Sequence, residues 1–282
     1  MGEKTTVVLF LSIFLIIQLL GIFVGSKYIE GIKEGSVLPV VENPESVASS
    51  LLFFSYILIG TGVIILIIKF KKFFIRIIEA VSIFFASWIT FDFLIPYEFF
   101  FFSIGFYLAV ILTAWKMLRP SIISQNTAVI FTASGVGAVI GASFGIAPSI
   151  VFMLLLSIYD FVSVFITKHM VYMAKALTER PTAFTVGIPS DLRKITVGKV
   201  RDVGKKIHVF QLGAGDIVLP LMFNVSILRA FSLTNTLFAM VGAMIMLGLL
   251  IYHVTKNPGK ALPALPFISL GSLSGFILSL FI

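Results

Sequence analysis

The chain has 282 residues, of which 59% are hydrophobic and only 12% are charged. Since a soluble domain carries about 25% charged residues, this composition excludes an ordinary water-soluble globular protein. The net charge is +8 and there is no cysteine, which excludes disulfides and thiolate metal sites. In a membrane protein such basic residues usually gather in cytoplasmic loops, so no nucleic-acid partner is expected.

Repeated apolar runs of about 20 residues, each long enough to cross ~30 Å of hydrocarbon, predict an all-α, polytopic membrane protein. Nine transmembrane helices are expected, at about 6–26, 48–68, 74–93, 98–116, 126–147, 149–168, 208–228, 231–252 and 262–282. The first run exceeds the usual apolar core of a signal peptide and is taken as the first span. Tight turns are predicted at Ala147-Pro148 and Arg229-Ala230.

The distribution of basic residues predicts the orientation of these helices. With the N-terminus in the cytoplasm and nine spans, eighteen of the 21 Lys and Arg residues fall in cytoplasmic segments or at their edges. Basic residues favour the cytoplasmic side of a membrane, so the N-terminus is expected inside and the C-terminus outside.

One long polar stretch, 169–207, separates the sixth and seventh predicted spans. Its Pro, Gly and charged residues predict a cytoplasmic loop. Near its end, Lys206 to Phe210 is rich in β-favouring residues and could be extended. We expect one transmembrane domain over 1–282, with spans one to six in about 6–168 and spans seven to nine in about 208–282.

Two acidic residues, Asp160 and Asp216, lie well inside apolar runs. Asp160 precedes Lys168 by eight residues and Asp216 follows Lys206 by ten. In helices these separations correspond to depths of ~12 Å and ~15 Å below the cytoplasmic boundary. Because the two spans are antiparallel neighbours, the carboxyl groups are expected at similar depth, where they could face each other.

Each aspartate at the centre of a membrane costs roughly 2.5–3.5 kcal/mol, which suggests a use for the pair. Facing carboxyl groups in low dielectric share one proton and can supply a general base and a general acid, as in aspartic proteases. Intramembrane carboxylates also serve proton or cation transport. The pair alone therefore leaves transport and catalysis about equally supported.

The residues around Asp216 favour access by another backbone. Gly213 and Gly215 remove side-chain bulk just before the aspartate, although glycines also serve ordinary helix packing. Pro220 has no N–H, so the carbonyl of Asp216 loses its helical partner.

A third segment, Leu262 to Pro266, opens the last predicted span with two prolines three residues apart. Such a start keeps backbone groups exposed where an extended substrate could bind, or it merely begins a helix.

Together these segments resemble the GxGD intramembrane aspartyl proteases, presenilin and signal peptide peptidase. The match comprises Tyr159-Asp160, Gly213-Ala214-Gly215-Asp216 and Pro263-Ala264-Leu265, in this order and on predicted spans six, seven and nine. The resemblance covers essentially the whole chain. It implies that Asp160 and Asp216 are catalytic.

The resemblance also implies supporting roles for other residues of the motifs. Tyr159, Gly213 and Gly215 would support the aspartates, and Pro263–Leu265 would contact substrate. Ala214 stands where leucine is common in the family, which bears on cleavage-site preference more than on activity. The loop after span six lacks the hydrophobic segment at which presenilins are cut, so a single uncut chain is expected.

The predicted function is hydrolysis of peptide bonds within transmembrane segments of membrane proteins or signal peptides. The expected partners are substrate helices and the lipid bilayer. No metal, organic cofactor or accessory subunit is expected, while a homo-oligomer is compatible with the sequence. We expect a multi-pass protein of the cell membrane. A proton- or cation-coupled transporter and a cation leak channel, using the same carboxylates, are the alternatives.

Other proteolytic chemistries have weaker support. Serine chemistry would need a buried Ser–His pair, and the three histidines fall at span ends. No His-Glu-x-x-His helix is present for a metalloprotease.

Overall fold

The computed structural model describes residues 3–41, 43–70, 72–167, 185–189, 209–256 and 262–281. Within these residues it has nine α-helices, which confirms the predicted all-α polytopic architecture. The helices are α1 (Glu3–Glu34), α2 (Val47–Phe70), α3 (Lys72–Leu94), α4 (Ile104–Leu118), α5 (Ile122–Ser143), α6 (Ile146–Phe161), α8 (Gly215–Ala230), α9 (Leu233–Lys256) and α10 (Leu265–Ser279). Six are long and apolar enough to cross a membrane, and α4 and α10 are shorter apolar helices.

Helix α1 is longer than the apolar run that predicted it. Its 32 residues correspond to roughly 48 Å, more than the hydrocarbon thickness. Lys27 and Glu30 form an ion pair one turn apart at 2.9 Å, which favours helix beyond the apolar run. The helix ends where Gly35 takes a φ of +73°, a conformation that glycine adopts without steric cost.

The predicted fourth span began too early. Glu98–Phe99 (β1) and Phe102–Ser103 (β2) form a two-stranded hairpin, and α4 starts after it. The Ser103 hydroxyl accepts from the backbone N–H of Phe106 and so caps the helix. Ser103 therefore separates the aromatic residues of the hairpin from those of α4, and a hydropathy average does not detect such a cap.

Three further boundaries differ for similar local reasons. Helix α5 begins four residues early because Ser121 and Ser124 form a capping box. The connection between α5 and α6 lies at Phe144 and Gly145, not at Ala147-Pro148, since proline fits the first turn of a helix. The connection between α8 and α9 likewise falls at 231–232, after the predicted Arg229-Ala230.

A two-stranded sheet lies where the sequence predicted part of the 169–207 loop and the beginning of the seventh span. Thr185–Pro189 (β3) pairs antiparallel with Val209–Gly213 (β4), from Thr185 opposite Gly213 to Pro189 opposite Val209. The expected extended conformation is confirmed at Val209 and Phe210, whereas the other residues of that stretch lie outside the described residues. The β-branched and aromatic content of β4 outweighed its hydropathy, and helix α8 begins only at Gly215.

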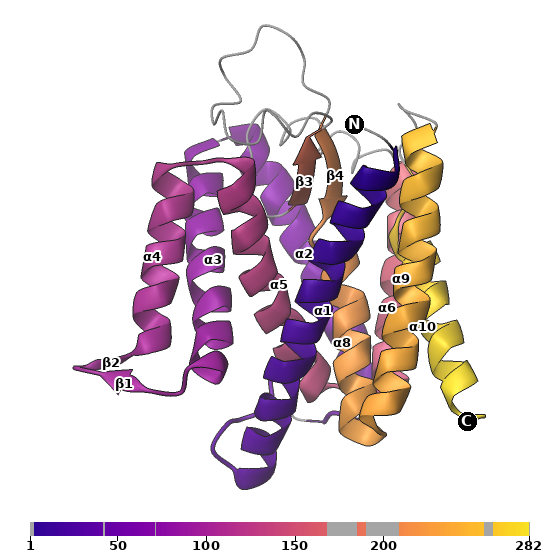
Figure 1. Ribbon diagram of the computed structural model, residues 1–282, viewed down its shortest axis with the longest axis horizontal. Coiled ribbons are helices and arrows are strands. Elements are labelled where there is room, and N and C mark those ends of the chain that lie inside the picture. The colour runs from indigo at the N-terminus through magenta and orange to yellow at the C-terminus, as the bar shows by residue number, and fades with distance from the viewer. Residues whose placement is uncertain are drawn as a thin grey trace, which may run out of the picture.

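The helices surround a central group formed by α1, α5 and α8 (Figure 1). The α3–α4 pair lies on one side of this group, and α6, α9 and α10 lie on the other. Side chains such as Phe14, Ile17 and Leu221 are buried in the shared core. The N-terminus lies at the end of the bundle that holds β3 and β4, and the C-terminus at the opposite end (Figure 1). The cytoplasmic position of the N-terminus stays a prediction.

The α3–α4 pair contains a buried charge pair. The Nζ atom of Lys116 lies 3.4 Å from Oε1 of Glu79, and the two residues are only 2% and 7% exposed. The Glu79 carboxylate therefore turns inward to the lysine. One turn away, Arg76 donates to the carbonyl of Met117 at 2.9 Å.

The α9–α10 pair packs through glycines. A Cβ atom built on Gly242 would lie 2.2 Å from the carbonyl oxygen of Gly271, and one on Gly275 would lie 2.3 Å from that of Phe238. Only glycine permits so close an approach of two helix backbones. Helix α10, which carries the Pro263–Leu265 segment at its start, is thereby fixed against α9.

Candidate active site

Asp160 lies near the end of α6 and is 8% exposed. The helix changes to one turn of π-helix at Val162–Ile166 directly after it. Such π turns inside helices are frequent at functional sites. The hydroxyl of Ser163 donates to the backbone carbonyl of Asp160 at 2.9 Å, which stabilises the chain at this change of geometry.

Asp216 lies in the first turn of α8, directly after β4. The predicted depth of Asp216 assumed the rise per residue of a helix. The five residues of β4, however, rise about twice as far per residue as helical residues do. Its side chain turns back toward the strand and forms a hydrogen bond with the Gly213 backbone. The start of a helix also favours negative charge, because the peptide dipoles point their positive end there.

The carboxyl group of Asp216 interacts electrostatically with that of Asp160. A third element approaches the same place, because the backbone N–H of Leu265 donates to Oδ2 of Asp160 at 3.2 Å. Helices α6, α8 and α10, distant in sequence, therefore meet at two carboxyl groups and one backbone donor. This arrangement can hold a water molecule between an acid and a base.

The other residues of the three motifs lie around this centre. Tyr159 is partly buried, and its ring packs against that of Phe54 on α2 at 6.3 Å between centroids. Pro263 and Ala264 are buried in the non-helical approach to α10. A Cβ atom on Gly215 would meet nothing within 4 Å, so this glycine is not required by packing among the described residues.

Two buried amide side chains near Asp216 were missed by the sequence analysis. Gln18 of α1 donates to the carbonyl of Ile217 at 3.1 Å and accepts from Asn224 of α8 at 2.9 Å. Both amide residues are 0% exposed. Their signal was available, since each is a polar residue inside an apolar run. No rule of spacing, however, relates residues 206 positions apart.

A second amide pair, Gln125 and Asn126 at the start of α5, binds β3. The hydroxyl of Ser157, one turn before Asp160, donates to that of Ser269 at 3.0 Å and joins α6 to α10. These contacts surround the aspartates without touching them.

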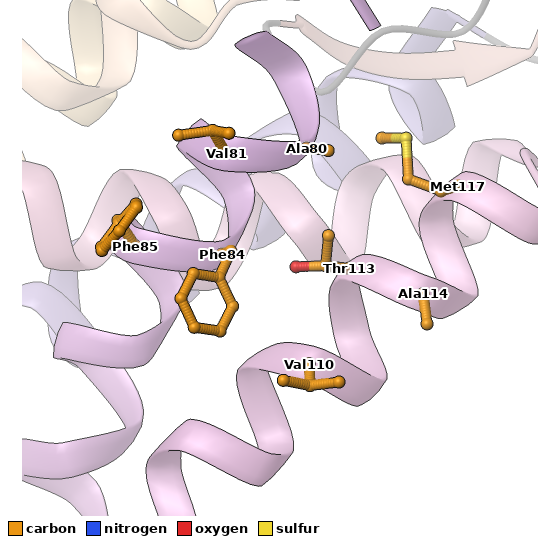
Figure 2. Close-up of a pocket in the computed structure, with 8 residues that line it drawn as sticks. All are labelled: Ala80, Val81, Phe84, Phe85, Val110, Thr113, Ala114 and Met117. Atoms are coloured by element: carbon orange, nitrogen blue, oxygen red, sulfur yellow. The ribbon is translucent and has the colours of Figure 1, made fainter. Parts of the chain in front are cut away.

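A surface groove of about 380 Å³ lies between α3 and α4 (Figure 2). Its walls are apolar side chains such as Phe84, Phe85 and Val110, and Thr113 is the one hydroxyl residue that lines it. None of its lining residues belongs to α6, α8 or α10, which carry the aspartates and Leu265. The groove is therefore separate from the candidate site.

Comparisons with known proteins bear on the fold and the family of the chain. No curated protein sequence matches the chain. Two crystal forms of a presenilin family intramembrane aspartate protease share the fold, in space groups C222 and P2. The first has a TM-score of 0.68 and 21% identity over 98% of each chain, and the second has 0.67 and 23% over 96% of each.

The sequence model of one family covers almost the whole chain. Residues 11–282 match the family described as signal-peptide peptidase, presenilin aspartyl protease. This match confirms the resemblance inferred from the three motifs. With its apolar helices and its convergent aspartates, the chain belongs to the signal peptide peptidase and presenilin family and is a multi-pass intramembrane aspartyl protease.

Proposed function

We propose that Asp160 and Asp216 are the catalytic pair of this protease. The observation that carries the proposal is their convergence: carboxyl groups from α6 and α8 interact inside the bundle, and the Leu265 N–H binds one of them. Two carboxyl groups held together in low dielectric share a single proton, which leaves one as base and the other as acid.

The proposed reaction needs only these two groups and water. The ionised carboxylate takes a proton from water while the hydroxide adds to the scissile carbonyl carbon. The protonated carboxyl gives its proton to the carbonyl oxygen, which forms a gem-diol. The carboxyl that took the water proton then gives it to the amide nitrogen while the other carboxylate takes a proton from a gem-diol hydroxyl. The C–N bond breaks, a carboxylic acid and an amine leave, and the pair again holds one proton. The shared proton belongs to the pair, so neither aspartate has a fixed role.

Substrate is proposed to bind as an extended segment beside β4. The hydrogen bonds of antiparallel strands alternate along each strand. Asn126 binds both backbone groups of Gly187, so these groups point away from β4, and those of the opposite residue Gln211 point away from β3. The open edge of β4 can therefore pair with another strand and lead it toward Asp216.

Pro263, Ala264 and Leu265 are proposed to form the other wall of this passage. Their backbone is non-helical up to the start of α10, and Leu265 already contacts Asp160. Tyr159 is proposed to orient the first motif through its packing on Phe54. Gly213, which has no side chain, is proposed to leave room for the Asp216 carboxyl.

The proposed substrates are transmembrane segments of membrane proteins or signal peptides, delivered through the lipid bilayer. A single uncut chain is proposed to act as one domain in the cell membrane, without an accessory subunit.

The test uses purified full-length protein in lipid vesicles and a single-span peptide, with fragments followed by mass spectrometry. Asp160→Asn and Asp216→Asn should each abolish cleavage while the unfolding temperature is retained, because neither variant can share a proton between two carboxyls. Asp92→Asn is the matched control. That aspartate also lies in a helix, but it binds Ser103 at the β1–β2 hairpin.

Wild-type protein that leaves the peptide intact, together with ion flux abolished by Asp216→Asn, would support a transporter and refute the protease assignment. Cleavage that survives in either catalytic variant would refute the pair.

A further inference from the structure

The side chains of Gln125 and Asn126 bind the outer edge of β3. The Asn126 amide donates to the carbonyl of Gly187 at 2.9 Å and accepts from the Gly187 N–H at 2.9 Å. The Gln125 amide donates to the carbonyl and the hydroxyl of Thr185, at 2.5 Å and 3.0 Å. Two adjacent residues of a helix thus hold alternate residues of one strand.

This contact forms the same pattern of hydrogen bonds that a neighbouring strand would form. The Asn126 amide offers one donor and one acceptor to the two backbone groups of Gly187, as an opposing strand residue would. A free edge of a sheet is open to pairing with any extended segment. At Gly187 and Thr185 that position is already occupied, so among the described residues only β4 retains an open edge in this part of the sheet.

The contact is buried and linked to the catalytic residue. Gln125 is 2% exposed, and Val186, between the two bound residues of β3, is 0% exposed. Thr185 lies opposite Gly213 in the sheet, and the Gly213 backbone binds Asp216. Only a strand pair therefore separates the α5 amides from the candidate catalytic carboxyl.

We infer that Gln125 and Asn126 are positioning residues, which close the β3 edge and hold β4 in the register that sets Gly213 beside Asp216. This inference rests on the proposed function, in which an extended substrate pairs with β4. Asn126 touches neither substrate nor the reacting atoms. It fixes which peptide bond of a paired substrate reaches the aspartates.

The experiment compares Asn126→Ala with wild type in the full chain, in vesicles with a single-span peptide. Without the amide pair, β4 is no longer held in one position, so the cut should spread from one main peptide bond to its neighbours. The turnover number kcat should fall about tenfold or more, since small misplacements of reacting groups are costly. Fragment masses give the distribution of cuts, and peptide titration separates kcat from KM.

Thr132→Ala is the matched control on the same helix. Its hydroxyl donates only to carbonyls of α5, among them Ala128 at 2.8 Å. It should therefore leave the distribution of cuts unchanged. A purely structural loss would lower the number of active molecules and the unfolding temperature, but it would not change the ratio of the products.

Gln125→Ala is the second variant, and it serves also if Asn126→Ala does not fold. It removes both donors to Thr185 and should spread the cuts in the same way. A wild-type ratio of products in a folded Asn126→Ala or Gln125→Ala protein would overturn the inference while leaving the protease assignment intact. Failure of the wild-type protein to cleave would instead overturn the proposed function.

Discussion

The two glycines that precede Asp216 have different surroundings. A Cβ atom on Gly213 would lie 3.1 Å from Oδ2 of Asp216, whereas one on Gly215 would meet nothing within 4 Å. The first position is needed because the aspartate side chain folds back over it. The second lies at the start of α8, where the described residues leave room for a side chain.

Gly213→Ala should therefore lower kcat, by about tenfold or more, because the methyl group displaces the Asp216 carboxyl from its position. Gly215→Ala should retain near-wild-type turnover and serves as the control. Steady-state cleavage of a single-span peptide by both variants measures the difference. Equal losses in the two variants would show that the glycines act through backbone flexibility instead.

The sequence alone could identify the charged residues of the candidate site, but it could not identify the uncharged residues that hold the surrounding backbone in place. An aspartate inside an apolar run is costly, so Asp160 and Asp216 stand out without any structure. Gln18 and Asn126 carry no charge and cost less to bury once paired. Their partners are backbone groups of Ile217 and Gly187, which any residue type would provide.

Among the helices, α9 and α10 form a unit that holds the Pro263–Leu265 segment. The glycine contacts bring the backbones of Gly242 and Gly271 together, and α10 begins at Leu265, which binds Asp160. A shift of α10 along α9 would therefore move the Leu265 N–H relative to the aspartate.

Gly271→Ala should destabilise the protein by about 1–3 kcal/mol, the usual cost of adding volume to a packed interface. Its methyl group would lie 2.4 Å from the carbonyl oxygen of Gly242, so α10 has to move. We also expect lower cleavage by the folded fraction. Denaturant unfolding in detergent, paired with a peptide assay, checks both effects.

Gly62→Ala on α2 is the matched control, because a Cβ atom there meets nothing within 4 Å. Alanine is the better helix former, so this change should be neutral or slightly stabilising. A Gly271→Ala protein as stable and active as Gly62→Ala would contradict the close packing.

The nine helices of the described residues could be predicted from hydropathy, whereas their ends depend on single polar side chains. Ser103 and Ser121 cap helices at positions that an apolar average does not register. Strand β4 was assigned mostly to a helix because its apolar residues continue into α8. Its pairing with β3 across the intervening chain decides the conformation, and that partner has no local signal in the sequence.

Across the whole molecule, the α3–α4 pair is separate from the helices that carry the candidate catalytic aspartates. It packs against α5, whereas α8 belongs to the central group and α6 and α10 lie on the other side of that group (Figure 1). Its buried Glu79–Lys116 pair joins two opposite charges in an apolar setting. Stability and turnover should therefore be separable by changes in this part of the fold.

Lys116→Met should destabilise the protein by roughly 3–5 kcal/mol, because it leaves the Glu79 carboxylate buried without its lysine. The double variant Glu79→Leu, Lys116→Met should recover most of that loss, since well-packed apolar residues often replace a buried ion pair at little cost. The kcat of the folded fraction should stay near wild type in both. Unfolding curves and active-site titration measure these quantities, and additive losses would contradict the predicted coupling.

The place of Asp216, between the open edge of a strand and the first turn of a helix, has a consequence for substrate choice. In the proposed function, a peptide can pair with β4 only after its own helical hydrogen bonds are broken there. The free energy of unwinding a few residues of the substrate then enters the activation barrier for every substrate. The choice of substrate would then depend more on the local stability of a transmembrane helix than on its amino-acid sequence. Unrelated substrates whose helices unwind equally easily would be cleaved equally well.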